Sequence, residues 1–343
     1  MNTVLTFLRE NRRRLNLATY GVPESLNCIL LTPRFRASSN VVFLIIPDDQ
    51  VEPVLVAKVP RLEGASEGAE REASNLQAVQ SLRPGGFDSI PRVVAFESYY
   101  GYPILVETAL TGQPMSPAMV RRDPLGCCNL TIKWLVDVQQ ASTHLACPEA
   151  TWFERLVEQP LRYLAKLLPT VPEEAQLLEQ TRTLLEPLRG TQLPLVFEHG
   201  DLSHPNIFLL QNGRAGVVDW ELAEPRGLPT YDLFFFLTYV TFARHNVHSN
   251  ERYLPSYRAA FFGHDGWARP YIARYAEQLS LPQEVLTPLL VLCWARYLST
   301  QLTRIVGVSP AHEQVGHNTA AWLRTNRYYA LWEYTVNHVN DLW

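Results

Sequence analysis

One short polar segment between apolar runs carries the residue types best suited to chemistry in this 343-residue chain. In VFEHGDLSHPNIFLL, residues 196–210, four residues separate Asp201 from Asn206, and Asp219 ends the later apolar run GVVD. A loop carboxylate can accept the proton of an attacking hydroxyl, and amide and carboxylate oxygens are the hard ligands that Mg²⁺ prefers. The spacing therefore predicts phosphoryl transfer from ATP, with Asp201 as the base and Asn206 and Asp219 as ligands of Mg²⁺.

These motifs resemble those of the aminoglycoside phosphotransferase and choline kinase family, which comprises small-molecule kinases with a protein-kinase-like fold. The resemblance rests on HGDLSHPNIF followed by VVDWE and covers most of the chain. It implies a two-lobed α+β fold, with a small antiparallel sheet in the N-terminal lobe and a mainly helical C-terminal lobe. It also implies transfer of the γ-phosphate of ATP to a hydroxyl group of a small molecule.

The same resemblance gives a role to an upstream lysine. Lys58, in VLVAKVP, matches the lysine that holds the α- and β-phosphates of the nucleotide, and the chain has only two other lysines, Lys133 and Lys166. Glu72, on the helix that follows, matches the ion-pair partner of that lysine. Glu70 and Glu67 are the alternatives for this partner.

Further nucleotide contacts follow from the resemblance. The segment ASSNVVFL matches the turn that covers the phosphates and implies contacts from Ser38, Ser39 and Asn40, although this turn contains no glycine. The segment ILVETALTG matches the hinge between the lobes, where backbone atoms near Glu107 and Ala109 would contact adenine.

The polar loop also contains two histidines. We expect His199 to brace the loop and not to act as a base. His204, followed by Pro205, differs from the commoner Pro-Gly before the asparagine. We interpret it as a local variant of the loop, with contact to the substrate as the alternative.

The elements that must position these residues follow from local patterns. Short β-branched apolar runs predict strands over 26–32, 41–46, 54–59, 92–98 and 102–108, and helix-forming composition predicts a helix over 66–82. We therefore expect an N-terminal lobe over 1–108 and a C-terminal lobe over 109–343, the latter starting with a turn-rich linker and containing short strands over 193–220. Helical periodicity predicts helices over 129–146, 151–168, 173–189, 231–246, 250–262, 269–279, 284–305 and 318–338.

Composition excludes several other classes of protein. A formal net charge of −4 argues against a nucleic-acid-binding protein. The sequence contains no run of 18 apolar residues, so it predicts no membrane span. Five cysteines without a CxxC pair, and an N-terminus unlike a signal peptide, lead us to expect a cytoplasmic protein. The sequence does not indicate an oligomeric state.

Two other functions are compatible with the fold. A nucleotide-binding pseudokinase would act as a scaffold without turnover, but such proteins usually lack one of the polar elements present here. A kinase acting on protein would need an activation loop. Only about a dozen residues separate Asp219 from the next predicted helix, which leaves little room for such a loop.

The charge of the C-terminal region indicates the class of acceptor. Residues 227–343 contain nine arginines, eight acidic residues and 21 of the 37 aromatic residues. A nearly neutral, aromatic-rich lobe offers little long-range attraction to a polycation. We therefore expect a neutral or singly charged hydroxyl compound as the acceptor, and we expect aminoglycosides to be poor substrates.

Overall fold

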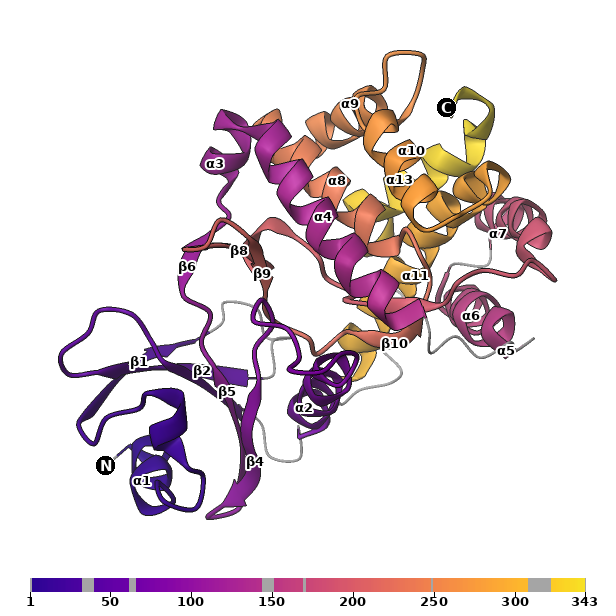
Figure 1. Cartoon of the computed structure of the whole chain (residues 1–343). Coiled ribbons are helices and arrows are strands. Elements are labelled where there is room, and N and C mark those ends of the chain that lie inside the picture. The colour runs from indigo at the N-terminus through magenta and orange to yellow at the C-terminus, as the bar shows by residue number, and fades with distance from the viewer. Residues whose placement is uncertain are drawn as a thin grey trace. The chain divides into compact units, whose positions relative to one another are not determined.

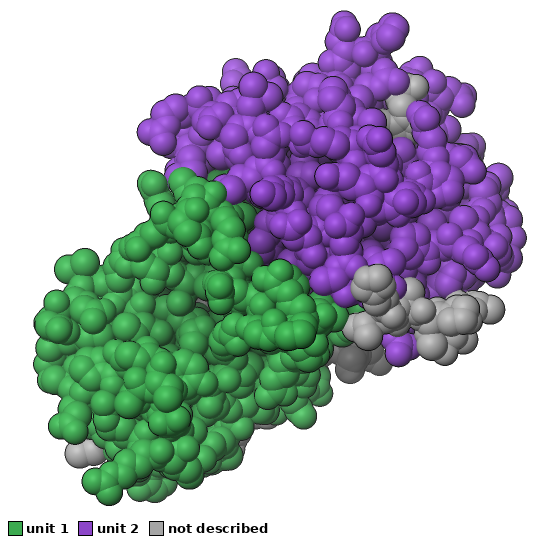
Figure 2. Space-filling view, viewed as in Figure 1, with its two compact units in different colours: residues 1–115, 199–201, 205–225 green, residues 116–198, 202–204, 226–343 purple. Residues whose placement is uncertain are grey.

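The computed structural model describes residues 2–32, 40–61, 66–143, 151–168, 171–247, 249–307 and 322–342. The chain forms two compact units (Figure 2). The first unit comprises residues 1–115, 199–201 and 205–225, and the second comprises residues 116–198, 202–204 and 226–343. The first unit thus contains more than the expected lobe 1–108, because strands that follow the polar loop pair with residues 112–114.

A five-stranded antiparallel sheet forms the centre of the first unit (Figure 1). The strand order is β1-β2-β3-β5-β4, and helix α2 connects β3 to β4. The strands and the helix begin and end within two residues of the predicted positions: β1 (Leu26–Leu31), β2 (Asn40–Pro47), β3 (Leu55–Pro60), α2 (Glu67–Gln80), β4 (Val93–Tyr99) and β5 (Tyr102–Thr108).

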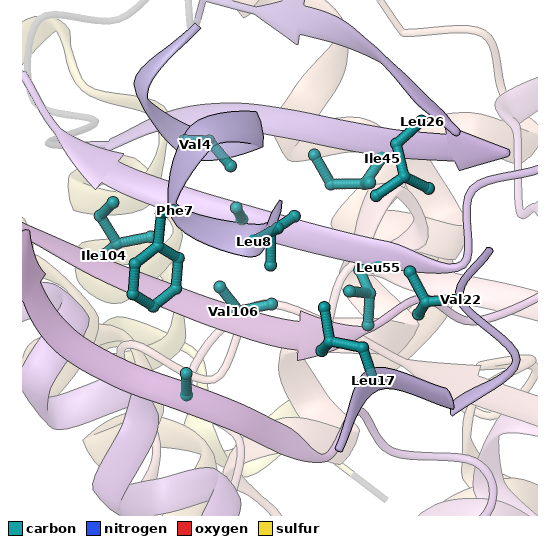
Figure 3. Close-up of a cluster of buried hydrophobic side chains, with 12 residues drawn as sticks. Val4, Phe7, Leu8, Leu17, Val22, Leu26, Ile45, Leu55, Ile104 and Val106 are labelled. Carbon is teal, nitrogen blue, oxygen red and sulfur yellow. The ribbon is translucent and has the colours of Figure 1, made fainter. Parts of the chain in front are cut away.

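Helices cover both faces of this sheet because side chains alternate along its strands. Ile104 and Val106 of β5 belong to one core cluster, together with Phe7 and Leu8 of helix α1 (Thr3–Glu10) (Figure 3). Leu105 points to the opposite face, where it joins a second cluster with alanines of α2. Helix α1 and the short 3₁₀ helix η1 (Leu17–Tyr20) were not predicted from the sequence.

A second, smaller sheet completes the first unit. It contains β6 (Gly112–Pro114), β8 (Ile207–Leu210) and β9 (Ala215–Val217) in the order β6-β8-β9. The β8–β9 hairpin pairs Ile207 with Val217, so the residues just outside it, Asn206 and Val218, face each other. The predicted linker after Gly112 therefore begins as a strand.

The second unit is built around helix α8 (Tyr231–Arg244), which is buried along nearly its whole length. A helix that is apolar on all sides belongs in a core, and α8 contacts α3, α4, α9 and α11. A short sheet pairs β7 (Val196–Glu198) with β10 (Glu224–Gly227). The other helical elements are α3 (Pro117–Arg122), α4 (Pro124–Thr143), α5 (Thr151–Phe153), η2 (Glu154–Glu158), α6 (Gln159–Leu167), α7 (Pro172–Leu185), η3 (Glu186–Leu188), α9 (Asn250–Phe261), α10 (Arg269–Gln278), η5 (Gln283–Val285), α11 (Leu286–Gly307), α13 (Arg327–Asn337) and η6 (Val339–Asp341). The short helix η4 (His204–Asn206) begins in the second unit and ends in the first.

The predicted helices agree with these elements in position and differ mainly at their ends. Helix α4 begins at Pro124, five residues before the predicted start, and α13 covers only the last part of the helix predicted over 318–338. Residues 308–321 lie outside the described part of the chain. Within the described ranges, we find no helix with the length and apolarity that a bilayer crossing requires.

Replacing Phe7 with alanine tests the contribution of α1 to the first unit. Phe7 is 1% exposed and packs edge-to-face on Tyr99, with ring centroids 5.3 Å apart. We expect Phe7→Ala to lower the free energy of unfolding by about 3–5 kcal/mol, the usual cost of removing a buried phenylalanine side chain. Urea denaturation measures this loss. A loss no larger than that of Leu125→Ala, at an exposed leucine, would show that α1 is only loosely attached.

Candidate active site

A buried lysine lies among three carboxylates in the first unit. Lys58 of β3 forms a salt bridge with Glu72 of α2, and its ammonium nitrogen lies 3.4 Å from Glu107 Oε1 and 3.9 Å from Asp219 Oδ1. Lys58, Glu72 and Glu107 are at most 7% exposed, whereas the Asp219 side chain is 43% exposed. The cluster therefore has a closed side formed by two glutamates and a more open side at Asp219.

Burial and charge act in opposite directions on this lysine. Burial alone would lower the pKa of the Lys58 ammonium group, but Glu107, Glu72 and Asp219 together raise it well above its usual value. Burial also raises the pKa of Glu72, and it raises the pKa of Glu107 to about 8, although Lys58 lowers both. Lys58 is therefore a permanent cation, and Glu107 is the carboxyl group most ready to hold a proton at neutral pH.

Helix α2 also holds the segment that follows Asp219. Glu72 Oε1 accepts a hydrogen bond from the Trp220 backbone N–H at 3.1 Å. The Asn75 side-chain amide donates to the carbonyl oxygens of Trp220, at 2.9 Å, and Ala223, at 3.1 Å. One turn of α2 thus holds both Lys58 and the backbone beside Asp219.

His199 connects the polar loop to the strand that leads to Asp219. Its Nε2 lies 3.0 Å from the Val218 carbonyl oxygen, and its Nδ1 accepts a hydrogen bond from the Asp201 N–H at 3.3 Å. These two partners require a neutral ring protonated on Nε2. Burial lowers the pKa of His199 to about 4, which agrees with this neutral form. This geometry supports the bracing role that we expect from the sequence.

Asp201 and Asn206 interact directly. The Asn206 amide nitrogen donates to the Asp201 backbone oxygen at 2.9 Å and to the Asp201 carboxylate at 3.2 Å. The backbone carbonyl oxygen of Asn206 accepts a hydrogen bond from the Val218 N–H at 3.0 Å, so Asn206 lies beside the residue that precedes Asp219. Both of these side-chain hydrogen bonds are donated by the amide nitrogen, so the side-chain oxygen is the atom of Asn206 that can bind a cation.

Two backbone positions in the site have left-handed conformations. Gly200 has φ = 83°, and a Cβ atom there would collide with the Leu222 carbonyl oxygen, so the loop needs glycine between His199 and Asp201. Asp219 has φ = 70°, a region that aspartate tolerates better than most residues. Such a conformation in a polar cluster is typical of functional sites.

The structure brings together most of the residues singled out from the sequence. Asn40 is buried at the start of β2, and its Oδ1 has no hydrogen-bond partner among the described residues; Ser38 and Ser39 lie outside them. The Ala109 N–H donates to the Val54 carbonyl oxygen at 3.1 Å, so this N–H is already used within the sheet. Glu107 contributes a side chain to the site, whereas the sequence indicated only its backbone.

Asn206 and Asp219 fit a magnesium ion that phosphate groups help to coordinate. Both offer hard oxygen ligands, and Mg²⁺ in nucleotide sites is usually held by one or two carboxylates together with phosphates and water. Within the described part of the chain, no cluster of three or more His, Cys, Asp or Glu residues forms a complete protein-only metal site. The donor set thus suits a metal that arrives with its nucleotide.

Glu107 should make stability depend on pH. The folded chain holds a proton on Glu107 up to about pH 8, whereas an unfolded chain releases it near its ordinary pKa of about 4.3. The stability that the folded state gains by holding a proton on Glu107 is therefore complete below about pH 4. It is lost as the pH rises to about 8. We expect Glu107→Gln to have nearly the wild-type melting temperature at pH 5 and a higher one than wild type at pH 9.

Thermal unfolding of the two proteins between pH 5 and pH 9 measures this difference. Glu70→Gln, at an exposed position on α2, is the matched control and should show a difference from wild type that does not vary with pH. A constant difference for Glu107→Gln as well would contradict the protonated state of Glu107.

Solved structures of small-molecule kinases have the same fold. Choline kinase LicA from Streptococcus pneumoniae is similar with a TM-score of 0.54 and 12% identity, over 93% of this chain and 99% of its own. A GDP complex of an aminoglycoside 2'-phosphotransferase-IIIa mutant is similar with a TM-score of 0.55 and 13% identity, over 96% and 98% of the two chains. A thermostable mutant of aminoglycoside phosphotransferase APH(4)-Ia, in a ternary complex with AMP-PNP and hygromycin B, has a TM-score of 0.54 and 14% identity, over 95% and 98%.

At these identities the likeness establishes the fold alone, and it confirms the predicted kinase-like α+β architecture. A search of curated proteins by sequence gives no significant match. The model of the phosphotransferase enzyme family matches residues 33–276, which is well over half of the chain and includes Lys58, Asp201, Asn206 and Asp219. The protein therefore belongs to the phosphotransferase enzyme family, as its motifs predict.

Proposed function

We propose that the protein transfers the γ-phosphate of ATP to a hydroxyl group of a small molecule, in a reaction that depends on Mg²⁺. The observation that carries this proposal is the position of the Lys58 ammonium group, 3.9 Å from the Asp219 carboxylate. A fixed cation beside a metal-binding carboxylate is the arrangement that a nucleotide with its magnesium ion requires. The Asp201–Asn206 pair supplies the polar groups for the transfer itself.

Lys58 and Glu72 have the binding role in this proposal. Lys58 contacts the α- and β-phosphates, and Glu72 holds the ammonium group in place through their buried salt bridge. Asn40, Ser38 and Ser39 contribute to the phosphate turn, and the backbone near Glu107 and Ala109 contacts the adenine ring.

Asp201 has the catalytic role. Its carboxylate accepts the proton of the acceptor hydroxyl as that oxygen attacks the γ-phosphorus atom. Asn206 orients the carboxylate by donating to it at 3.2 Å, and His199 holds the Asp201 N–H at 3.3 Å. Both bonds fix the direction of the proton acceptor before the substrate arrives.

Asn206 and Asp219 would hold the magnesium ion through their side-chain oxygens. When bound, the ion supplies positive charge that offsets the charge of the phosphates. Asp219 suits this role because its side chain is 43% exposed and its backbone is held by α2 through Trp220. A scaffold that binds nucleotide without turnover is the alternative function, and the substitution of Asp201 separates it from catalysis.

Replacing Asp201 with asparagine tests the proton acceptor. We expect Asp201→Asn to keep nucleotide affinity within about threefold of wild type and to lower kcat by at least about 100-fold, because the amide cannot accept the proton. Coupled ADP-release assays and nucleotide titration give the two quantities. If the variant turns over at close to the wild-type rate, Asp201 is not the proton acceptor. If neither the wild type nor the variant shows turnover, the scaffold function is favoured.

Replacing Asp219 with alanine tests the metal ligand. We expect Asp219→Ala to lose most of the rise in melting temperature that ATP gives in the presence of Mg²⁺, because ligand binding stabilises the folded state only where the site is complete. The melting temperature without ligand should fall only slightly, since the Asp219 side chain is 43% exposed and Lys58 keeps its two buried partners, Glu72 and Glu107. A full rise with ATP and Mg²⁺ in this variant would show that the metal is held elsewhere.

A further inference from the structure

A cavity of about 250 Å³ lies in the second unit, between the polar loop and the helices around α8. Its lining includes His204, Arg121, Arg327 and the aromatic side chains of Tyr239, Phe242 and Tyr253. Ligand sites for drug-sized molecules usually measure about 300–1,000 Å³. This cavity therefore suits a small compound or one end of a larger one.

The cavity is positively charged. Two of its lining residues are arginines, and none of the described residues that line it is acidic. Arginine stays charged in proteins, and its planar guanidinium group matches the geometry of a carboxylate or a phosphate. The cavity should therefore attract anions and repel cations.

Arg327 is held in a fixed orientation by aromatic rings. Its guanidinium carbon lies 4.6 Å from the ring centroid of Tyr253, 4.9 Å from that of Tyr328 and 5.9 Å from that of Phe242. Arg121 is fixed as well, because its Nη1 donates to the Ala243 carbonyl oxygen at 3.2 Å. Arginines oriented in this way lose little conformational freedom when they bind an anion.

His204 adds a polar atom that lacks a partner. Its Nδ1 is buried and makes no hydrogen bond to any described residue, although the ring packs against Tyr239 with centroids 5.7 Å apart. A ring nitrogen can take part in one hydrogen bond, as a donor or as an acceptor. Buried polar atoms are normally satisfied, and a bound ligand would satisfy this one.

The cavity lies close to the proposed proton acceptor along the chain, because His204 and Asp201 belong to the same polar loop. His204 follows Asp201 by three residues, so their Cα atoms are at most about 11 Å apart. A hydroxyl compound anchored in the cavity by one end could thus present its other end to the proton acceptor.

We propose that the cavity lined by Arg121, His204 and Arg327 binds a carboxylate or phosphate group of the acceptor, which is therefore an anionic hydroxyl compound. This inference rests on the proposed function and makes the acceptor class more specific. It agrees with the expectation that polycationic aminoglycosides are poor substrates, and it assigns His204 to the substrate site.

Four hexoses that differ in charge test the proposal: glucose, glucosamine, glucuronate and glucose 6-phosphate. Calorimetric titration of the full chain measures the affinity for each. We expect at least one of the two anions to bind at least tenfold more tightly than both glucose and glucosamine, and the tighter anion identifies carboxylate or phosphate as the group. Equal affinities for all four sugars, tightest binding of glucosamine, or no binding of either anion would overturn the proposal.

Variants of Arg327 locate the binding. Arg327→Gln should weaken binding of the preferred anion at least tenfold and leave that of glucose unchanged, and Arg327→Lys should recover part of the loss because it keeps the charge. Arg252→Gln, at an exposed position of α9 that does not line the cavity, is the matched control. An equal loss of anion binding in Arg252→Gln and Arg327→Gln would show a general effect of charge and overturn the assignment to this cavity.

ADP-release assays with the same sugars separate this inference from the proposed function. Arg327-dependent binding of an anion without ADP release would leave the cavity assignment standing and contradict phosphotransfer to that class of acceptor. Asp201-dependent ADP release that is equal for glucose and glucosamine, and unaffected by Arg327→Gln, would support the phosphotransferase and contradict the anionic acceptor.

Discussion

The burial of one ammonium group among three carboxylates is the constraint on which the first unit depends. Lys58 joins β3 to α2 through Glu72, and the same Glu72 oxygen accepts a hydrogen bond from the backbone N–H of Trp220. Removing one partner of a buried ion pair typically costs about 3–5 kcal/mol, because the remaining charge stays buried. A strand, a helix and the segment that contains Asp219 are therefore held together by a single set of charges.

The same constraint explains why the site suits phosphate chemistry. A lysine that burial alone would neutralise keeps its charge because the neighbouring carboxylates raise its pKa. On the other side of Asp219, the neutral ring of His199 connects Val218 to the Asp201 N–H. In the proposed function, these contacts hold the proton acceptor and the metal ligand in fixed directions without adding further charge.

Local patterns predicted much of this architecture, and the remainder depends on tertiary contacts. Short β-branched apolar runs predicted the five strands. The spacing of Asp201, Asn206 and Asp219 indicated one site, and the structure shows why: a hairpin returns the chain to the same place. The role of the Glu107 side chain was missed because it depends on register: β3 and β5 pair Lys58 with Leu105, which places Glu107 on the same face two residues later. Helix α1 was missed although Asn2 caps it and Val4, Phe7 and Leu8 have helical spacing. The cavity at His204 has no local signature, because it forms from residues far apart in the sequence.

If Lys58 holds the phosphates of the nucleotide, as we propose, its loss should weaken the binding of ADP and not that of adenosine. Calorimetric affinities of both ligands, in the presence of Mg²⁺, should be determined for the wild-type protein and for Lys58→Met. We expect the gain in affinity from adenosine to ADP to fall at least tenfold in Lys58→Met, while adenosine binds both proteins about equally. The same gain in both proteins would show that other groups hold the phosphates.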